Sequence, residues 1–520
     1  MRLEYVLVAL FAVATAVALV ARRLRLPYTV ALVLAGLALG SAHALEAPHL
    51  TKELLYAVFL PGLLFEAAFA LEFKKFWANK TAVSALAVPG LLLAIGLTAV
   101  LLVPVVNGPH FVDEFPLIEG LVFAAVVAAT DPIAVVGLFK ALGAPKRLAV
   151  LVEGEGLLND GTAVVVFTII VGVAAGLPFS LPVAIVDFVR VVGMGLFIGV
   201  AFGYGASLVI QKVDDPMIEI TLTTIAAYGS FVAAEHFHFS GVIATVTAGM
   251  ICGNYAARTG MSPSTRIAVA TFWEYLAFAL NSLVFLLIGF EVQVESLVAA
   301  LKPIVVGFVA VLAARAIVVF VVGFLLKRTK ESFPTSWAAV LTWGGLRGSL
   351  SMVLVLGLPA TLPLRDLLVT TTFGVVSLSI LVQGLTMGPL LKRLGLVGQR
   401  GAALELERQR AQAAASAAAL DELERLAREG SVSSGTLTSV RQEFEARQAE
   451  ARRAIEAVHL EAAEVAADER RRTLSRALMA EKDSLLSAKA SGALSPEVAD
   501  ELMADVDRRL VDAAAPPTAG

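Results

Sequence analysis

The chain has 520 residues, 58% of them hydrophobic, and its mean hydropathy is +0.81. A soluble globular protein could not bury that much apolar surface, so the composition indicates a polytopic membrane protein. The net charge of −3 is too small to favour nucleic acid or another strongly charged partner, and the single cysteine, Cys252, excludes a disulfide framework.

About thirteen apolar segments are long enough to cross a bilayer, for which a helix needs about 20 residues. They lie near 4–21, 27–44, 50–71, 82–106, 116–142, 148–176, 184–210, 217–236, 240–256, 268–292, 303–326, 334–359 and 366–391. The first is interpreted as a retained span rather than a signal peptide, because its apolar run is long and its arginines follow it. The third contains an acidic residue, Glu66.

Basic residues concentrate in alternate connections between these segments. The basic connections carry Arg22, Arg23, Arg25, Lys74, Lys75, Lys80, Lys140, Lys146, Arg147, Lys212, Arg258, Arg266, Lys327, Arg328, Lys330, Lys392 and Arg393. The other connections hold only scattered basic residues, and 107–118 holds none. By the positive-inside rule, the N-terminus is expected outside and the C-terminus in the cytoplasm.

After about residue 400 the composition shifts to Ala, Glu, Arg and Gln, and long apolar runs end. We therefore divide the chain into a transmembrane domain, 1–395, and a helical cytoplasmic tail, 396–520. The stretches 402–428 and 436–489 have apolar stripes at helical spacing. Two interpretations of the tail stay open, a solvated helical extension and a regulatory or dimer-stabilising domain. A ligand or protein that such a domain would bind is not identified.

The fifth segment contains Thr130-Asp131-Pro132 in the middle of an apolar run. A proline pushes the preceding residue out of the α region, so the helix is expected to break at Thr130-Asp131. Broken helices at membrane depth expose carbonyl groups and half-helix ends that can bind ions. Asp131 is thus a candidate cation ligand, together with the hydroxyl and carbonyl of Thr130. A cap for the second half-helix is the structural alternative, and the two roles are compatible.

The sixth segment carries Glu155, Asn159 and Asp160. At about 100° per residue, Glu155 and Asn159 share a face, whereas Asp160 lies about 140° from Glu155. One carboxylate should therefore face the ion and the other should pair with a fixed cation. The membrane region offers Arg315 and Arg347 for that pairing, and the residues alone do not choose between them.

If Glu155 is paired, Asp160 is the group that binds either a proton or a monovalent cation. Both loaded forms are neutral, while the empty form carries a bare charge that is costly to move through a dry intermediate. Only loaded forms would cross, which predicts obligatory one-for-one exchange. Asn159 can fix the geometry of the carboxylate without adding a second titrating group, and this favours electroneutral exchange.

The twelfth segment contains Trp343-Gly344-Gly345-Leu346-Arg347-Gly348. Three glycines in six residues indicate an unwound helix, although glycines also serve close helix contacts. Arg347 is the charged residue at this second break. Segments five and twelve are then expected to be a pair of interrupted helices, one in each half of the membrane domain. Such a pair is typical of inverted repeats around a midplane site.

With these residues in view, the chain resembles bacterial NhaP-type sodium/proton antiporters of the monovalent cation/proton antiporter-1 family, which includes animal sodium/proton exchangers. The matching stretches are LPGLLFEAA (60–68), ATDPIAVVGLF (129–139), EGEGLLNDGTAVVVF (153–167), SGVIATVTAGM (240–250), FWEYLAFALNSLVFLLIG (272–289) and WGGLRGSLSMVLVL (343–356). They cover most of residues 1–395, and the ND and GGLRG signatures together are specific.

The resemblance implies an all-α fold of 13 transmembrane helices, with two interrupted helices that cross between a core and a dimer domain, in a homodimer of the bacterial plasma membrane. It implies cation ligands at Asp160, Asp131, the Thr130 carbonyl and Glu66, and a salt bridge from Glu155 to Arg315. The transported species would be sodium, lithium or potassium and a proton. No cofactor and no enzyme activity are expected.

One position departs from the family pattern, because Gly156 stands where a serine that can serve as a ligand is common. This leaves open whether sodium or potassium is preferred. A potassium/proton antiporter, a cation-gated channel, a transport-inactive sensor and an organic-solute symporter are the alternatives. The intact acidic signatures favour antiport over a channel or sensor, and the scarcity of other polar residues argues against a symporter.

Overall fold

The computed structural model describes residues 3–24, 27–41, 55–108, 115–291, 294–397, 399–429 and 433–461, with scattered positions between 474 and 509. Over these residues the regular structure is helical. Parts of the predicted segments lie outside the described residues, namely 42–44, 50–54, 292 and much of 462–489. The chain forms two compact units, Met1–Val397 and Gly398–Gly520.

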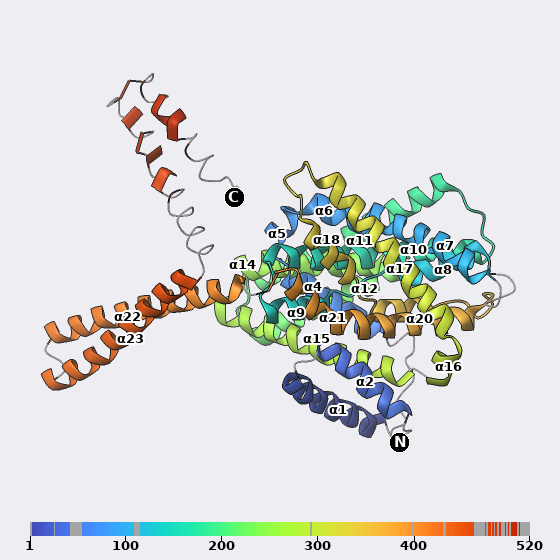
Figure 1. Cartoon of the computed structure of the whole chain (residues 1–520), viewed down its shortest axis with the longest axis horizontal. Helices are drawn as coiled ribbons and strands as arrows, with labels where there is room; N and C mark the ends of the chain where they lie inside the picture. Colours follow the sequence, from blue (N-terminus) through green and yellow to red (C-terminus); the bar gives the residue numbers. More distant parts are fainter. Residues whose placement is uncertain are drawn as a thin grey trace. The chain divides into compact units, whose positions relative to one another are not determined.

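The first unit is built of helices (Figure 1). In chain order they are α1 (Leu3–Leu24), α2 (Tyr28–Ser41), α4 (Leu60–Ala70), α5 (Phe73–Trp77), α6 (Lys80–Ala85), α7 (Leu91–Val106), α8 (Leu117–Val126), α9 (Ile133–Leu142), α10 (Lys146–Ala174), α11 (Leu181–Ile210), α12 (Pro216–His236), α13 (Gly241–Ile251), α14 (Ala257–Thr259), α15 (Pro263–Glu291), α16 (Val294–Ala299), α17 (Leu301–Leu326), α18 (Thr335–Trp343), α19 (Ser349–Leu356), α20 (Arg365–Leu378) and α21 (Gly384–Arg393). Four π-helical turns join some of them, namely η1 (Leu55–Phe59), η2 (Leu86–Gly90), η3 (Cys252–Ala256) and η4 (Ser379–Gln383).

Each predicted apolar segment falls on one of these helices or on helices in direct succession. The predicted breaks are confirmed, because the fifth segment divides into α8 and α9 and the twelfth into α18 and α19. Three short helices, α5, α14 and α16, lie outside the predicted segments. With five, three and six residues, they are too short to produce a periodic pattern.

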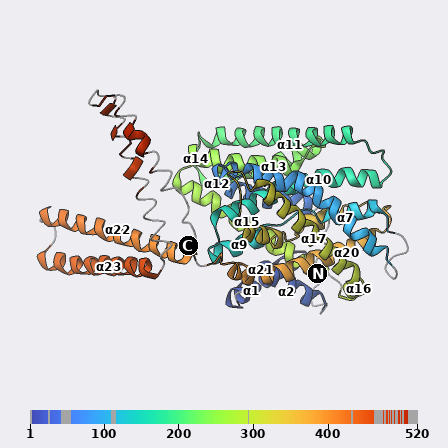
Figure 2. The same cartoon turned by 45° about the horizontal axis from the view of Figure 1, so that its top comes forward.

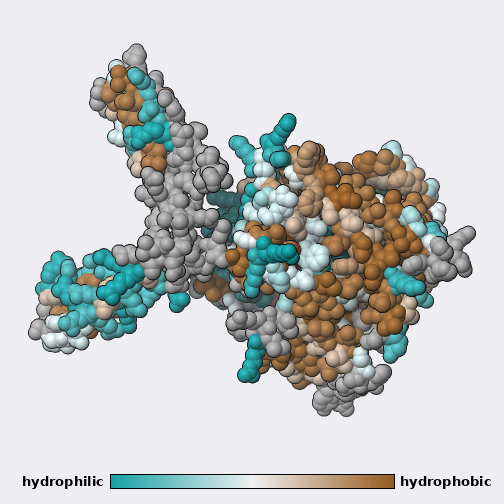
Figure 3. Space-filling model, viewed as in Figure 1, coloured by the Kyte–Doolittle hydropathy of each residue, from teal (hydrophilic) through white to brown (hydrophobic). Residues whose placement is uncertain are grey.

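The outer surface of the first unit is apolar. Among the described residues, seven helices are long and apolar enough to span a membrane, and four shorter apolar helices accompany them. Most of the face of this unit in Figure 3 is hydrophobic. Helix α11 is a clear case, with Leu181 at 61% and Phe197 at 64% exposure. Because water would penalise so much exposed apolar area, this unit is a multi-pass membrane domain.

Helices approach closely where small residues meet. Helix α2 packs on α15, and a Cβ atom added to Gly36 would collide with the carbonyl oxygen of Leu286. Gly289 faces the backbone of α2 in the same way, at Val33. Such contacts allow strong dispersion attraction where lipid removes the hydrophobic drive between helices. Figure 2 shows α11 along one margin of the first unit and α1 and α2 along the opposite margin.

The second unit begins with a helical hairpin of α22 (Gln399–Glu429) and α23 (Ser434–Glu461), which pack against each other. Arg441 of α23 donates to Glu424 of α22 at 2.9 Å, which links the two helices. The surface of the hairpin is largely hydrophilic in Figure 3, as expected for a segment in water. Its ion pairs are exposed to solvent, which screens them, so they contribute little to stability.

Candidate cation-binding site

The first interrupted segment breaks between Val126 and Ile133. The carboxylate of Asp131 accepts a hydrogen bond from the backbone N–H of Ile133 at 2.9 Å, so it caps the start of α9. The backbone N–H of Asp131 donates to the carbonyl of Leu346 at 2.7 Å. Since Leu346 belongs to the second break, this hydrogen bond joins the two interruptions directly.

The second break supplies a buried guanidinium to the first. Arg347, which is 5% exposed, donates through Nη1 to the carbonyl of Ala128 at 2.7 Å and to that of Ala129 at 3.2 Å. These carbonyls follow the end of α8 and lack the partners that a continuing helix would provide. A cation is favoured at such a helix C-terminus. Arg347 therefore stabilises the break itself.

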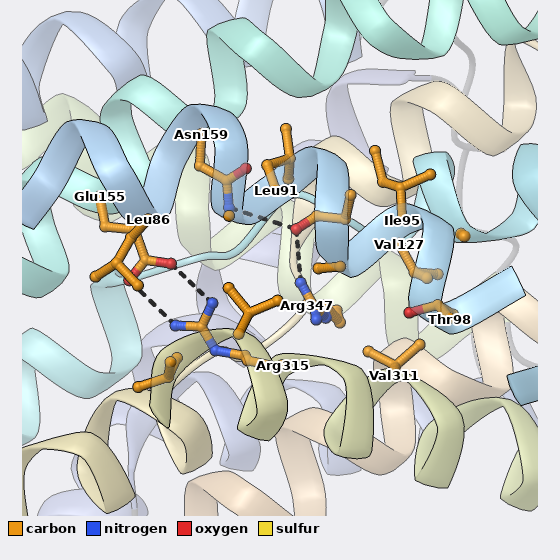
Figure 4. Close-up of a pocket in the computed structure, with 16 residues that line it drawn as sticks. Leu86, Leu91, Ile95, Thr98, Val127, Glu155, Asn159, Val311, Arg315 and Arg347 are labelled. Carbon is orange, nitrogen blue, oxygen red and sulfur yellow. Dashed lines mark hydrogen bonds and ion pairs between the residues drawn. The ribbon is translucent and has the colours of Figure 1, made fainter. Parts of the chain in front are cut away.

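Asn159 of α10 approaches the same break. Its Nδ2 donates to Thr130 Oγ1 at 3.2 Å and lies 3.4 Å from the carbonyl oxygen of Ala128. Figure 4 shows that Asn159 and Arg347 converge on that carbonyl. The amide thus fixes the unwound backbone that carries Thr130 and Asp131.

Glu155 and Arg315 form a two-pronged ion pair. The Nη1–Oε1 distance is 2.7 Å and the Nη2–Oε2 distance is 3.2 Å. Their side chains are 4% and 11% exposed. Arg315 Nε also donates to the carbonyl of Leu341 at 2.9 Å, which ties the pair to α18. Of the two arginines that the sequence leaves open, the structure places Arg315 against Glu155.

Glu155 and Asp160 of α10 face two different cavities. Glu155 and Asn159 line a space of about 20 Å³ together with Arg315 and Arg347 (Figure 4). Asp160 lines another space, of about 40 Å³, on the other side of the helix. One water-sized occupant needs about 10–15 Å³ in this measure. The second cavity therefore has room for a partly dehydrated cation.

The cavity at Asp160 has an unusual charge distribution. Asp131 and Thr130 line it with Asp160, and no basic side chain is among its lining residues, all of which the structure describes. Its walls are formed by α4, the first break, α10 and the start of α19, through Leu60, Leu63, Leu64, Ala67, Ala129, Pro132, Ile133, Gly156, Leu157, Gly348, Ser349 and Leu350. Two carboxylates in an apolar enclosure require a proton or a cation as partner.

Glu66 does not line this cavity, although Leu63, Leu64 and Ala67 of the same helix do. It lies instead within electrostatic range of Lys140, Glu153 and Glu274. The structure thus brings Asp131, Asp160 and Thr130 together, and Glu66 of α4 is not among the residues that line their cavity. A single acidic residue in an apolar run does not indicate which face of its helix it occupies.

Gly156 brings α10 into direct contact with the first break. A Cβ atom added there would lie 2.9 Å from two carbons of the Pro132 ring and 3.3 Å from the carbonyl oxygen of Thr130. A serine at this position would therefore have to displace the proline. In this chain, α10 contributes packing at position 156 and no side-chain ligand.

Two residues that we did not predict lie at the same site. A Cβ atom added to Gly348 would be 2.5 Å from the Asp131 carboxylate oxygen Oδ2, and Ser349 lines the cavity. The glycine-rich pattern indicated a broken helix but not what the glycines face. Only the contact between the two breaks, 131 with 346–349, reveals it.

We expect Gly348→Ala to weaken cation binding strongly. The backbone at Gly348 is extended, with φ −133°, so alanine can adopt it, and the cost comes from the collision with Asp131. A displaced carboxylate should raise the KM for sodium by about tenfold or more, as lost charged contacts do. Exchange in proteoliposomes measures this. Gly137→Ala is the matched control, because a Cβ there meets nothing within 4 Å; equal effects of both changes would contradict the assignment.

Comparisons with known proteins agree on one family. The model of the family described as "Sodium/hydrogen exchanger, transmembrane" matches residues 6–393 of this chain. The chain is 40% identical over 314 residues to the Na(+)/H(+) antiporter ApNhaP of Aphanothece halophytica, with 60% of each chain covered. It is 34% identical over 410 residues to the Na(+)/H(+) antiporter NhaH of Halobacillus dabanensis, with 75% of this chain and 97% of that protein covered.

The fold is also similar to that of a solved structure. The sodium proton antiporter MjNhaP1 of Methanocaldococcus jannaschii superposes with a TM-score of 0.60 at 19% identity, and the match covers 74% of this chain and 100% of that chain. This likeness concerns the fold. The chain spans less than two thirds of the length of two relatives that it matches, 60% of ApNhaP and 55% of the low-affinity antiporter NhaS1 of Synechocystis.

Proposed function

Because the chain belongs to the sodium/hydrogen exchanger family, we propose that it exchanges a monovalent cation for a proton across the bacterial plasma membrane. One observation carries this proposal: Asp131 and Asp160 line a common cavity whose described lining residues include no basic side chain. Such a cavity is electrostatically incomplete without a proton or a cation. The names of similar proteins support sodium as the cation.

In the proposed cycle, Asp160 binds a proton on one side of the membrane and a cation on the other. Asp131, the Thr130 carbonyl and Glu66 are the further cation ligands in this proposal, although Glu66 does not line the cavity in this structure. Asn159 stabilises the unwound backbone at Ala128 and Thr130 through hydrogen bonds. The ion pair of Glu155 and Arg315 links α10 to α17. Asp131 accepts a hydrogen bond from the backbone N–H of Ile133, which holds its carboxylate at the start of α9.

The proposal includes an architecture for transport. Thirteen membrane spans, related by inverted repeats, would place the two breaks near the midplane, with the N-terminus outside and the tail in the cytoplasm. The protein would work as a homodimer, with the tail as a regulatory or dimer-stabilising element. The exposed apolar side chains of α11 and the direct hydrogen bond between Asp131 and Leu346 support this arrangement.

The first test is exchange in proteoliposomes that contain a pH-sensitive dye. Addition of sodium, lithium and potassium in turn should dequench the dye for at least one ion. The order of the three responses decides between a sodium and a potassium antiporter, which matters because Gly156 provides no side-chain ligand. No response to any of the three ions at any pH would refute the proposed function.

The second expectation concerns charge movement. Asn159 supplies an amide rather than a second titrating carboxylate, and Glu155 stays paired, so one proton should be exchanged for one cation. A membrane potential should therefore not drive the cycle, although about 100 mV is worth ~2.3 kcal/mol per charge. The measurement uses liposomes clamped with potassium and valinomycin, after potassium is shown not to be a substrate. Exchange driven by potential alone would rule out the one-for-one cycle.

A further inference from the structure

Ser349 occupies a place at the cavity that its sequence context does not reveal. It is the first residue of α19, and it lines the cavity together with Asp131, Asp160 and Thr130. Its neighbour Gly348 touches the Asp131 carboxylate, and Leu346 accepts the backbone hydrogen bond of Asp131. The contacts of Leu346 and Gly348 with Asp131 therefore fix where Ser349 lies relative to Asp131.

The hydroxyl of Ser349 makes no hydrogen bond to any described residue. Many serine and threonine hydroxyls in the spans are occupied locally, as when Thr162 Oγ1 donates to the carbonyl of Leu158 at 2.9 Å, whereas six buried ones, Ser351 among them, have no partner among the described residues. Thr130 Oγ1, the other hydroxyl at the cavity, already accepts from Asn159. Ser349 thus offers the cavity an unused oxygen, which can accept through two lone pairs and donate one proton.

The chemistry of the site has use for such an oxygen. Hard cations are bound by several oxygen atoms, from carboxylates, carbonyls, hydroxyls and water. The cavity is lined by two carboxylates and by Thr130, which can supply oxygen ligands. Gly156 has no side-chain oxygen to add, and the ring of Pro132 fills the space that a side chain at position 156 would need. A hydroxyl adds a ligand without a charge, so it leaves the one-for-one balance intact.

We propose that Ser349 Oγ is a ligand of the transported cation, supplied by the second interrupted segment. In the cation-loaded state the hydroxyl accepts the cation through a lone pair. In the proton-loaded state it rotates and donates its O–H to a carboxylate oxygen of the cavity. This inference rests on the proposed function, and it assigns part of the cation selectivity to α19 rather than to α10.

The test compares three variants in the full-length protein. Ser349→Ala should raise the KM for sodium by about three- to tenfold, the usual effect of one lost polar contact, with the maximal rate unchanged. Ser349→Thr keeps the hydroxyl and should stay near the wild-type KM. Ser351→Ala is the matched control, because Ser351 is on the same helix, fully buried, and outside the lining of the cavity.

A measurement of sodium binding tests the role of Ser349 without relying on the transport assay. Sodium bound to the folded protein raises its Tm by mass action, and Ser349→Ala should need a correspondingly higher sodium concentration for the same rise. An unchanged KM and an unchanged sodium-dependent Tm in Ser349→Ala would overturn the inference, as would equal losses in Ser351→Ala. Absence of exchange in the wild-type protein would instead count against the proposed function, so the two failures are distinguishable.

Discussion

The Asp160→Asn variant is expected to fold normally and to have no measurable cation/proton exchange. Asparagine has nearly the shape of aspartate, but it neither binds a proton in this pH range nor carries a charge that attracts a cation. The cavity would keep Asp131 and Thr130, so its geometry should persist. Without a group for which proton and cation compete, the coupling between the two is lost.

The measurement is dye dequenching in proteoliposomes, with size-exclusion profile and Tm as evidence of folding. Asp187→Asn provides a matched control, because Asp187 is an aspartate of α11 whose side chain is 47% exposed and pairs with the exposed Arg190 at 3.5 Å. That variant should exchange like the wild type. Retention of more than about a tenth of the wild-type rate in Asp160→Asn would remove this residue from the carrier role, since a tenfold loss is only about 1.4 kcal/mol.

The Glu155→Gln variant is expected to be strongly destabilised rather than specifically inactive. The change removes the carboxylate that faces the buried guanidinium of Arg315, which then keeps neutral acceptors such as the carbonyl of Leu341. Removal of one member of a buried pair typically costs about 3–5 kcal/mol, whereas replacing both members costs much less. We therefore expect a lower Tm and a lower yield of folded protein.

A double-mutant cycle identifies the partner. Glu155→Gln with Arg315→Gln should recover part of the lost stability, because no uncompensated charge stays buried. Glu155→Gln with Arg347→Gln should not, since Arg347 binds the carbonyls of Ala128 and Ala129 instead. Thermal unfolding of six proteins in one detergent, namely the wild type, the three single variants and the two double variants, measures both couplings. Recovery with Arg347→Gln and not with Arg315→Gln would show that the pairing in the structure is not the one that stabilises the protein.

At both breaks of the membrane domain, the exposed polar backbone is hydrogen-bonded by groups from another segment. Each break exposes polar backbone that lipid cannot satisfy, and each is covered by groups from another segment. Arg347 and Asn159 cover the first break, and the N–H of Asp131 covers the carbonyl of Leu346 in the second. The cavity at Asp131 and Asp160 has no basic side chain among its described lining residues, so its two carboxylates are left to bind a proton or a cation.

Local patterns in the sequence were sufficient for some of these features. The apolar segments can be found from local composition, because a helix that crosses the hydrocarbon core needs about 20 predominantly apolar residues in succession. The break before Pro132 follows from the steric clash between a proline and its preceding residue. The separation of Glu155 from Asp160 follows from the helical rotation of about 100° per residue, and the two residues indeed face different cavities.

Only the tertiary structure decided which distant residues meet. Glu155 and Arg315 are 160 positions apart, and nothing local distinguishes Arg315 from Arg347 as the partner. The displacement of Glu66 from the cavity, the contact of Gly348 with Asp131 and the presence of Ser349 at the site likewise depend on how helices are rotated and packed. A sequence encodes its local conformational preferences residue by residue, whereas the partners across the site are selected by close packing of all the helices at once.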